Sequence, residues 1–480
     1  MLRFRLLLTA LLAVAGRAAA QPVVDGVFPP EEFAARRAAV FQRIGDAVAV
    51  LAGTTDRPGE QPLRQGNQFY YLSGVVEPQA LLLLDGRTRR TTLFLRPRDD
   101  RRIARMLGPM LYPGDSAARA TGIDSVLDRA AFADAIARVA SDGRTIYTPF
   151  RPEVLGSAST YDVVHLARVT HDDPWDGRPS REEAFRAKLQ AAAPRSELRD
   201  LDPMLDTLRG TKSPREIAVI REATRITGLA IVEAMRDARP GMTEYELQAD
   251  AEFVFKKHGA YGAAYFALVA TGPNTFYSHY HRNTARLADG DLVQFDYAPD
   301  YDYYVSDVTR VFPASGRFTP RQREFYGAYL ALYRALLSSI RPHVTAADVA
   351  AAAVPKMDSI LARFPFTDAR IRDAARRFVD GFRRPIPSLG HTIGMEVHDV
   401  AYPTRTLEPG QIFTIEPAMQ IPEEHLGLRL EDMLLVTERG VENLSADVPV
   451  EIADIERVMA EPGLSDRAAP ARPRPRAPRR

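Results

Sequence analysis

The strongest constraint on the fold is a pair of acidic residues placed inside apolar, strand-like segments. Asp296 lies in the segment Asp291–Ala298, and Asp307 lies in the segment Tyr303–Arg310. We predict a hairpin whose turn falls near residues 299–302, because the two acids are nearly symmetric about that point. In such a hairpin the acids become cross-strand neighbours on one face. Like charges placed opposite each other are destabilising, so something positive is expected between them.

A second pair of segments repeats this arrangement. Glu416 and Glu431 each lie in an apolar, strand-like segment, and the turn region Pro422–His425 separates them. For any single acid, pairing with an arginine such as Arg310 or Arg429, or a place on a solvated face, is the simpler interpretation. For all four acids together, a pair of divalent cations is the better interpretation, because burying unpaired carboxylates is costly.

The histidines are distributed unevenly and supply candidate ligands. None of the nine occurs in the first 160 residues. His279 precedes the first acidic hairpin, and His391 and His398 precede the second. Gly390 and Gly394 flank His391 and allow close backbone approach, which favours this histidine as a ligand. The chain has no cysteine, so thiolate sites and cysteine nucleophiles are excluded and any metal must be held by His, Asp and Glu.

The first half of the chain has a mixed pattern. Short apolar stretches at residues 47–51, 80–84 and 91–95 predict buried strands, and residues 132–139 predict a helix between strands. This alternation indicates an α/β domain, which we place at residues 27–205.

The second half has sharper helix signals. Ser213–Glu216, Thr243–Glu246 and Thr319–Gln322 have the pattern of N-terminal capping boxes. Strand-like segments with turn signals lie between and after these helices. We therefore predict an α+β domain over residues 206–458, with helices packed on a curved antiparallel sheet. Residues 459–480 end in an alternation of Ala, Pro and Arg that cannot bury apolar surface and predicts a disordered tail.

The N-terminus has the features of a secretory signal peptide over residues 1–20. Arg3 and Arg5 precede the apolar run Leu6–Val14, and Ala18–Ala20 offers a small-residue cleavage site. A membrane anchor is the alternative, but the run is shorter than the roughly 20 residues that span a bilayer. We expect export to a periplasm or out of the cell, with no stable membrane anchor. The net charge of +1 gives no indication of a nucleic-acid partner.

These features together resemble the pita-bread metallopeptidases, a family that includes methionine aminopeptidase, prolidase and aminopeptidase P. Its members use Asp, Asp, His, Glu and Glu, in this chain order, as metal ligands. The matching positions are Asp296, Asp307, His391, Glu416 and Glu431. Residues 65–74 and 77–80 resemble the N-terminal domain of aminopeptidase P, which methionine aminopeptidases lack. The resemblance covers most of residues 30–455 and is closest to the Xaa-Pro aminopeptidases. It implies an α/β N-terminal domain followed by an α+β pita-bread catalytic domain.

The resemblance implies a centre of two divalent metal ions. Asp296 would hold one ion, His391 and Glu416 would hold the other, and Asp307 and Glu431 would bridge both. Two ions that share a water lower its pKa, so that hydroxide is available at neutral pH. Mn²⁺ is the expected metal because it suits carboxylate-rich sites, with Zn²⁺ and Co²⁺ as alternatives.

The implied reaction is hydrolysis of the bond between the first residue of a peptide and a proline at the second position. Glu416 would move the proton, and His279 and His398 would stabilise the oxyanion and orient the substrate. A homo-oligomer, either a dimer or a tetramer, is a further possibility.

The sequence departs from the family pattern at two places, and other activities stay open. Proline-specific members usually have a histidine four residues before the metal histidine, where this chain has Pro387, and Ala418 replaces the glycine after Glu-Pro. The nearest alternative is a prolidase that cleaves Xaa-Pro dipeptides. A metal-free hydrolase of the creatinase type would have lost the ligands, all five of which are present. A non-catalytic peptide-binding protein is the third alternative.

Overall fold

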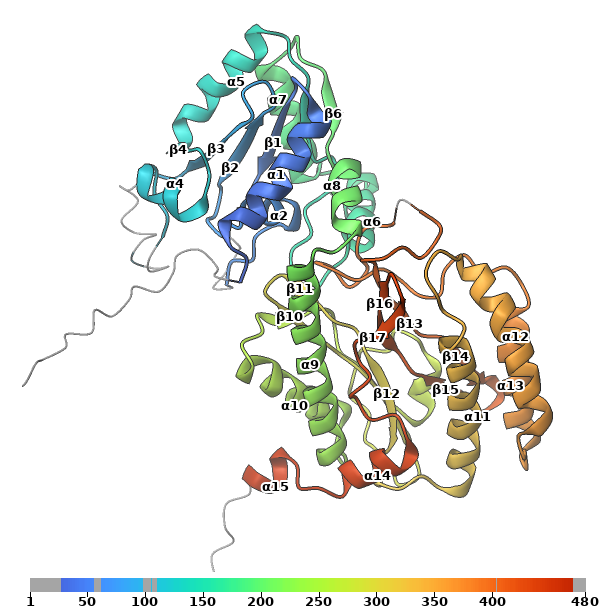
Figure 1. The fold of residues 1–480 in the computed structure, drawn as a ribbon. Helices are drawn as coiled ribbons and strands as arrows, with labels where there is room; N and C mark the ends of the chain where they lie inside the picture. Colours follow the sequence, from blue (N-terminus) through green and yellow to red (C-terminus); the bar gives the residue numbers. More distant parts are fainter. Residues whose placement is uncertain (1–26, 56–61, 98–104, 106–109, 403, 469–480) are drawn as a thin grey trace, which may run out of the picture.

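The structure is a computed structural model that describes residues 27–55, 62–97, 105, 110–402 and 404–468. It has two domains, which lie one above the other in Figure 1. The predicted signal peptide lies outside the described residues. No helix among the residues described is long and apolar enough to cross a membrane.

The N-terminal domain is built on one six-stranded mixed sheet. The strand order is β4-β3-β2-β1-β5-β6, with antiparallel pairs at β1–β2 and β2–β3 and parallel pairs elsewhere. The strands are β1 (Val48–Ala52), β2 (Leu81–Asp85), β3 (Arg90–Leu95), β4 (Ser125–Asp128), β5 (Ile146–Thr148) and β6 (Leu198–Asp200). The three predicted strand segments are thus confirmed, each within one residue at either end.

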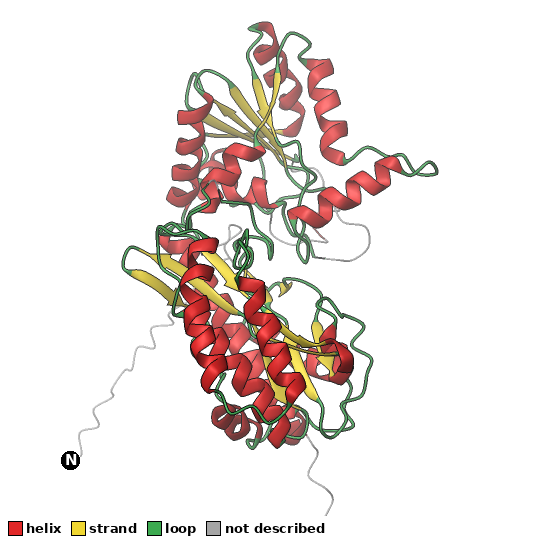
Figure 2. Ribbon diagram, turned by 90° about the vertical axis from the view of Figure 1, so that its right-hand side faces the viewer, coloured by secondary structure: helices red, strands yellow, loops and turns green. Residues whose placement is uncertain are grey.

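Helices cover both faces of this sheet, as Figure 2 shows for the upper domain. Along β1, Val48 and Val50 face one hydrophobic cluster while Ala49 and Leu51 face the other, as the two-residue period of a strand requires. The helices are α1 (Pro30–Ile44), α2 (Asn67–Ser73), α4 (Asp115–Thr121), α5 (Phe132–Ser141), α6 (Thr160–Asp172) and α7 (Arg181–Ala192), with the 3-10 turn η1 (Arg129–Ala131) before α5. The helix predicted at residues 132–139 is confirmed as α5, and the domain is α/β as predicted.

The second domain opens with helices, and the capping boxes predicted correctly where three of its helices begin. Helix α8 (Asp202–Gly210) joins the domains, and α9 (Pro214–Asp237) and α10 (Glu244–Lys257) follow. Ser213 and Glu216 cap α9 reciprocally, and Thr319 caps α11 (Pro320–Leu337) in the same way. The remaining helices are α12 (Ala346–Arg363), α13 (Ala369–Phe382), α14 (Ile452–Met459) and α15 (Leu464–Ala468).

Short antiparallel sheets lie against these helices and carry the acids. One contains β8, β9 and β12, one contains β7, β10 and β11, one contains β13, β16 and β17, and one contains β14 and β15. Their bounds are β7 (Gly262–Ala263), β8 (Leu268–Thr271), β9 (Leu292–Asp296), β10 (Pro299–Tyr301), β11 (Tyr304–Val305), β12 (Thr309–Pro313), β13 (Ile412–Ile415), β14 (Ala418–Ile421), β15 (Leu426–Arg429), β16 (Asp432–Thr437) and β17 (Gly440–Asn443), with 3-10 turns η2 (Gly272–Phe276) and η3 (Pro422–Glu424). The predicted α+β class is confirmed.

The first acidic hairpin differs from its prediction by two residues. Asp296 pairs with Thr309, and Tyr301 pairs with Tyr304, so the turn is at Asp302 and Tyr303. Both turn residues have positive φ, at 49° and 71°. Asp307 is therefore a diagonal neighbour of Asp296 on the same face rather than its direct cross-strand partner. The shared face was predicted correctly, and the exact pairing was wrong because the turn is tighter and later than expected.

The second hairpin agrees with its prediction. Ala418 pairs with Arg429 and Ile415 pairs with Asp432. Continuing this register between the two ladders places Glu416 opposite Glu431.

The predicted start of the disordered tail, at residue 459, is too early. Helix α14 extends to Met459, and Leu464–Ala468 forms α15. The backbone N–H of Ser465 donates to the Asp237 carboxylate of α9, at 3.0 Å to Oδ2, which ties the short helix to the domain. Residues 469–480 lie outside the described residues.

Candidate active site

The acids and histidines singled out in the sequence converge on one cavity, which the second domain forms for the most part. Each comes from the end of a strand or from a loop between elements, where the backbone ladder is interrupted. The predicted residues that line the cavity are His279, Asp296, Asp307, His391, His398, Glu416 and Glu431.

His391 is the geometric centre of the acidic cluster. Its Nε2 lies 3.4 Å from Asp307 Oδ2, 3.3 Å from Glu416 Oε1 and 3.9 Å from Glu431 Oε1. Asp307, His391 and Glu431 each offer a ligand atom within 4.8 Å of the others. This is the donor chemistry of a site for a divalent cation.

Arginine and tyrosine side chains contact the acids of the cavity. Arg429 forms a buried ion pair with Asp296, which was the simpler interpretation considered for a single acid. Arg310 instead pairs with Asp432, 2.8 Å away, and does not neutralise the cluster. The hydroxyl of Tyr265 lies 2.7 Å from Asp296 Oδ1 and 2.6 Å from Asp307 Oδ1, so one proton serves two carboxylates. No sequence signal pointed to Tyr265.

The cluster carries more negative charge than its protein neighbours compensate. Burial, and then the neighbouring Asp307, raise the pKa of Asp296 to about 7 in spite of Arg429. Burial, Asp307 and Glu416 also raise the pKa of Glu431 well above its ordinary value. Burial lowers the pKa of His391, but hydrogen bonding to Asp307 and Glu416 outweighs it and raises that pKa to about 10. Buried acids in this state call for further positive charge.

One buried oxygen provides a specific test of whether a metal fits. Glu431 is 1% exposed, and its Oε2 accepts a hydrogen bond from Thr309 Oγ1 at 2.8 Å. Its Oε1 has no hydrogen-bond partner among the described residues. Leaving a buried carboxylate oxygen unsatisfied is costly, and a cation beside His391 would satisfy it. The residues present therefore fit a metal.

Comparison with known proteins agrees with this site and with the domain in front of it. Residues 218–438 match metallopeptidase family M24, and residues 33–147 match the aminopeptidase P N-terminal domain. The Xaa-Pro aminopeptidase of Escherichia coli is 31% identical over 454 residues, which cover 89% of this chain and 97% of that protein. The chain belongs to metallopeptidase family M24.

Other M24 relatives are similar over the same length. The Xaa-Pro aminopeptidase of Haemophilus influenzae is 31% identical over 90% of this chain and 97% of its own, and the Xaa-Pro dipeptidase of Rattus norvegicus is 27% identical over 86% and 87%. Among solved structures, Escherichia coli aminopeptidase P in complex with substrate has a TM-score of 0.71 and 30% identity, covering 90% of this chain and 98% of that one. Proline aminopeptidase P II from Yersinia pestis has the same TM-score at 31% identity, covering 90% and 100%.

The two other predicted histidines of this M24 peptidase lie at different depths in the cavity. The ring of His398 meets the ring of His391 edge to face, with 4.2 Å between centroids. Burial, and then the charge on His391, lower the pKa of His398. His279 is exposed, and its ring lies 6.2 Å from that of Phe266 at the cavity wall.

The glycines around His391 do allow close approach, but to the protein itself. A β-carbon on Gly390 would lie 2.2 Å from the carbonyl oxygen of Thr414, and one on Gly394 would lie 1.9 Å from Asp399 Oδ2. The loop can therefore lie directly against β13, where Thr414 N donates to the carbonyl of His391 at 2.9 Å.

The two departures from the family pattern lie outside the metal cluster. Pro387 is exposed and does not line the cavity, and Ala418 begins β14, where it pairs with Arg429. The sequence also missed a contribution from the N-terminal domain, because Ser157, Ala158 and Asp162 line the same cavity. Nothing in their local pattern indicates a site.

Proposed function

We propose that this M24 metallopeptidase is an Xaa-Pro aminopeptidase, which hydrolyses the N-terminal residue of peptides that have proline at the second position. The carrying observation is the convergence of Asp307, His391 and Glu431 with two further acids on one cavity. The similarity to Xaa-Pro aminopeptidases extends through both domains, which favours this activity over that of one-domain relatives.

Two divalent ions, with Mn²⁺ expected, would bind in this proposal. Asp296 would bind one ion, His391 and Glu416 the other, and Asp307 and Glu431 both. When bound, the ions would polarise the scissile carbonyl and lower the pKa of the attacking water. Hard carboxylate oxygens outnumber the single imidazole, which supports Mn²⁺ over softer ions.

The other side chains then have distinct tasks. Glu416, whose side chain is 28% exposed, can accept a proton from the attacking water and pass it to the leaving nitrogen. His398, packed against His391, is placed to donate an N–H to the developing oxyanion, and His279 at the mouth can orient the peptide. Proline in the second position gives a tertiary amide without N–H, so recognition depends on the cavity wall rather than on that hydrogen bond.

The test uses an Xaa-Pro-Xaa tripeptide with protein that is chelated and then reloaded with Mn²⁺. Release of the first residue should require the metal and should be lost in Glu431→Ala. Glu438→Ala, an exposed acid in the turn after β16, is the matched control and should keep full activity. No release by folded, metal-loaded protein would refute the proposal.

The same assay separates the nearest alternative. A prolidase, like the rat relative, would cleave an Xaa-Pro dipeptide and leave the tripeptide intact. Tripeptide binding without cleavage of either substrate would instead indicate a non-catalytic peptide-binding protein.

We also propose that the protein is exported after removal of residues 1–20, on the basis of the N-terminal charge and apolar pattern. N-terminal sequencing of the mature protein should begin at Gln21. We propose a homodimer or homotetramer as its assembly, which sedimentation analysis would test.

A further inference from the structure

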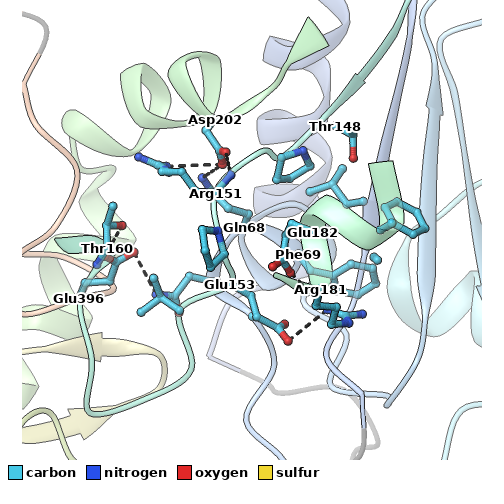
Figure 3. A pocket seen from close by; sticks show the side chains of 18 of the residues that line it. Gln68, Phe69, Thr148, Arg151, Glu153, Thr160, Arg181, Glu182, Asp202 and Glu396 are labelled. Atoms are coloured by element: carbon cyan, nitrogen blue, oxygen red, sulfur yellow. Dashed lines mark hydrogen bonds and ion pairs between the residues drawn. The ribbon is translucent and has the colours of Figure 1, made fainter. Parts of the chain in front are cut away.

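The loop between His391 and His398 is fastened to the N-terminal domain mainly through the side chain of Glu396, and Asn67 Nδ2 also donates to the carbonyl of Met395 at 3.3 Å. This residue is 2% exposed and belongs to the catalytic domain. Its Oε2 accepts hydrogen bonds from Thr160 N at 2.7 Å and Thr160 Oγ1 at 2.8 Å. Its Oε1 accepts from Arg209 Nη2 at 2.9 Å and Asn67 Nδ2 at 3.3 Å. Figure 3 shows Thr160 and Glu396 side by side at the edge of a second cavity, the interdomain cavity, whose lining includes Gln68, Arg151, Glu182 and Glu396.

The contact with Thr160 uses a group that a helix start leaves free. Thr160 is the first residue of α6, and its N–H has no partner within the helix. Ser159 and Asp162 cap the helix through other groups, so the Thr160 N–H is free to donate to the Glu396 carboxylate. A negative charge at a helix N-terminus is also favoured by the helix dipole.

The segment that Glu396 holds is a wall of the metal-site cavity. Ser157, Ala158 and Asp162 line that cavity from the N-terminal domain, and Val397 and His398 line it from the catalytic domain. Ser157 Oγ makes a second link by donating to the carbonyl of Ala263 at 2.7 Å. Glu396 therefore lies directly behind the junction where the two domains meet at the site.

The far side of the loop is held by buried charges that share Arg209 with Glu396. Asp399 accepts hydrogen bonds from Arg209 and from Lys212 Nζ, the latter at 2.9 Å. The side chains of all three are at most 2% exposed. The contact between Lys212 and Asp399 therefore holds the loop from the catalytic-domain side without involving Glu396. Loss of the Glu396 carboxylate should move the wall formed by α6 more than it moves His391.

We propose that Glu396 is a positioning residue that holds the first turn of α6 against the metal site, so that residues 157–162 form the peptide-binding wall. The kinetic part of this inference rests on the proposed peptidase function. Removing the Glu396 contact should weaken binding of substrate and transition state alike, which raises KM and leaves kcat nearly constant.

The test variant is Glu396→Gln. All four partners of Glu396 offer N–H or O–H donors, so an amide NH₂ must oppose a donor at one end. We expect KM for the tripeptide to rise about tenfold, as loss of a charge-assisted hydrogen bond implies, with kcat changed less than about threefold.

Thr160→Val, which keeps the backbone donor and loses only the hydroxyl, should raise KM by a smaller factor and covers the case in which Glu396→Gln does not fold. Glu182→Gln is the matched control and should leave KM unchanged, because Glu182 is a partly buried acid that lines the same interdomain cavity.

A second measurement does not depend on activity. Amide hydrogen exchange of the peptide around Thr160 should accelerate at least tenfold in Glu396→Gln and stay at the wild-type rate in Glu182→Gln. Unchanged exchange at Thr160 would overturn the tether, and accelerated exchange with unchanged KM would overturn its role in positioning. If exchange accelerates while the wild-type protein cleaves no Xaa-Pro peptide, the tether stands and the proposed function fails.

Discussion

Replacing Gly394 by alanine should destabilise the loop that carries His391 and His398. A β-carbon at position 394 would lie 1.9 Å from Asp399 Oδ2 and 2.9 Å from Lys212 Nζ. Since non-bonded carbon and oxygen atoms rest at roughly 3.5 Å, the Asp399 carboxylate or the loop must move by more than about 1 Å.

That movement acts on a buried ion pair. Lys212 Nζ lies 2.9 Å from Asp399 Oδ2, and both side chains are 1% exposed. Separating a buried pair leaves two charges without compensation and costs about 3–5 kcal/mol. We therefore expect the free energy of unfolding of Gly394→Ala to fall by about 3–5 kcal/mol.

Urea denaturation of chelated protein measures this change without a contribution from bound metal. The matched control is Gly327→Ala in the middle of α11, where the new β-carbon would lie 3.8 Å from Phe364 Cζ, an ordinary contact. The same substitution should there increase stability by about 0.5–1 kcal/mol, because alanine favours the helix. The expected loss is at least about 3 kcal/mol. If the free energy of unfolding of Gly394→Ala lies within about 1 kcal/mol of the wild-type value, the close-packing argument is refuted.

Three further predictions concern charge and metal. Burial and the nearby Glu153 raise the pKa of Glu182 to about 7. The stability that protonated Glu182 contributes is therefore present below its ordinary pKa and is lost as the pH rises through 7. In urea titrations, the free energy of unfolding of Glu182→Gln should gain about 2–3 kcal/mol relative to wild type between pH 4.5 and 8. Arg310→Met should cost about 3 kcal/mol in the same assay because Asp432 stays buried without its guanidinium, and a loss below 1 kcal/mol would contradict this. Excess Mn²⁺ should raise the melting temperature of chelated wild-type protein, because a ligand at a hundredfold excess over its Kd stabilises the folded state by about 2.7 kcal/mol. Calorimetry should find no such rise in Glu431→Gln.

Much of the fold followed from short-range patterns. Capping residues act on N–H groups three positions away, so Ser213 and Thr319 marked helix starts correctly. Apolar strands such as β1 and β2 are buried on both faces, and their short apolar runs identified them. The acids in apolar, strand-like segments were informative for the same reason, because buried charge conflicts with its local surroundings.

The tertiary structure decided how those elements meet. The first hairpin places Asp307 diagonal to Asp296 because its turn uses positive φ at two residues that are not glycine, and sequence gives little warning of such a turn. Tyr265 bridges the two acids from the bend between β7 and β8, across 31 and 42 residues of chain.

What the sequence by itself determined is the set of chemical groups: four acids in apolar, strand-like segments, a histidine between glycines, and no thiols. Only the tertiary structure decided that Glu396 meets Thr160, 236 residues away, and that the N-terminal domain closes one side of the site. The physical reason is that helix and strand periodicity record which side of an element is buried but not which distant element buries it. Contacts between domains depend on the packing of complete surfaces, and no single segment carries that information.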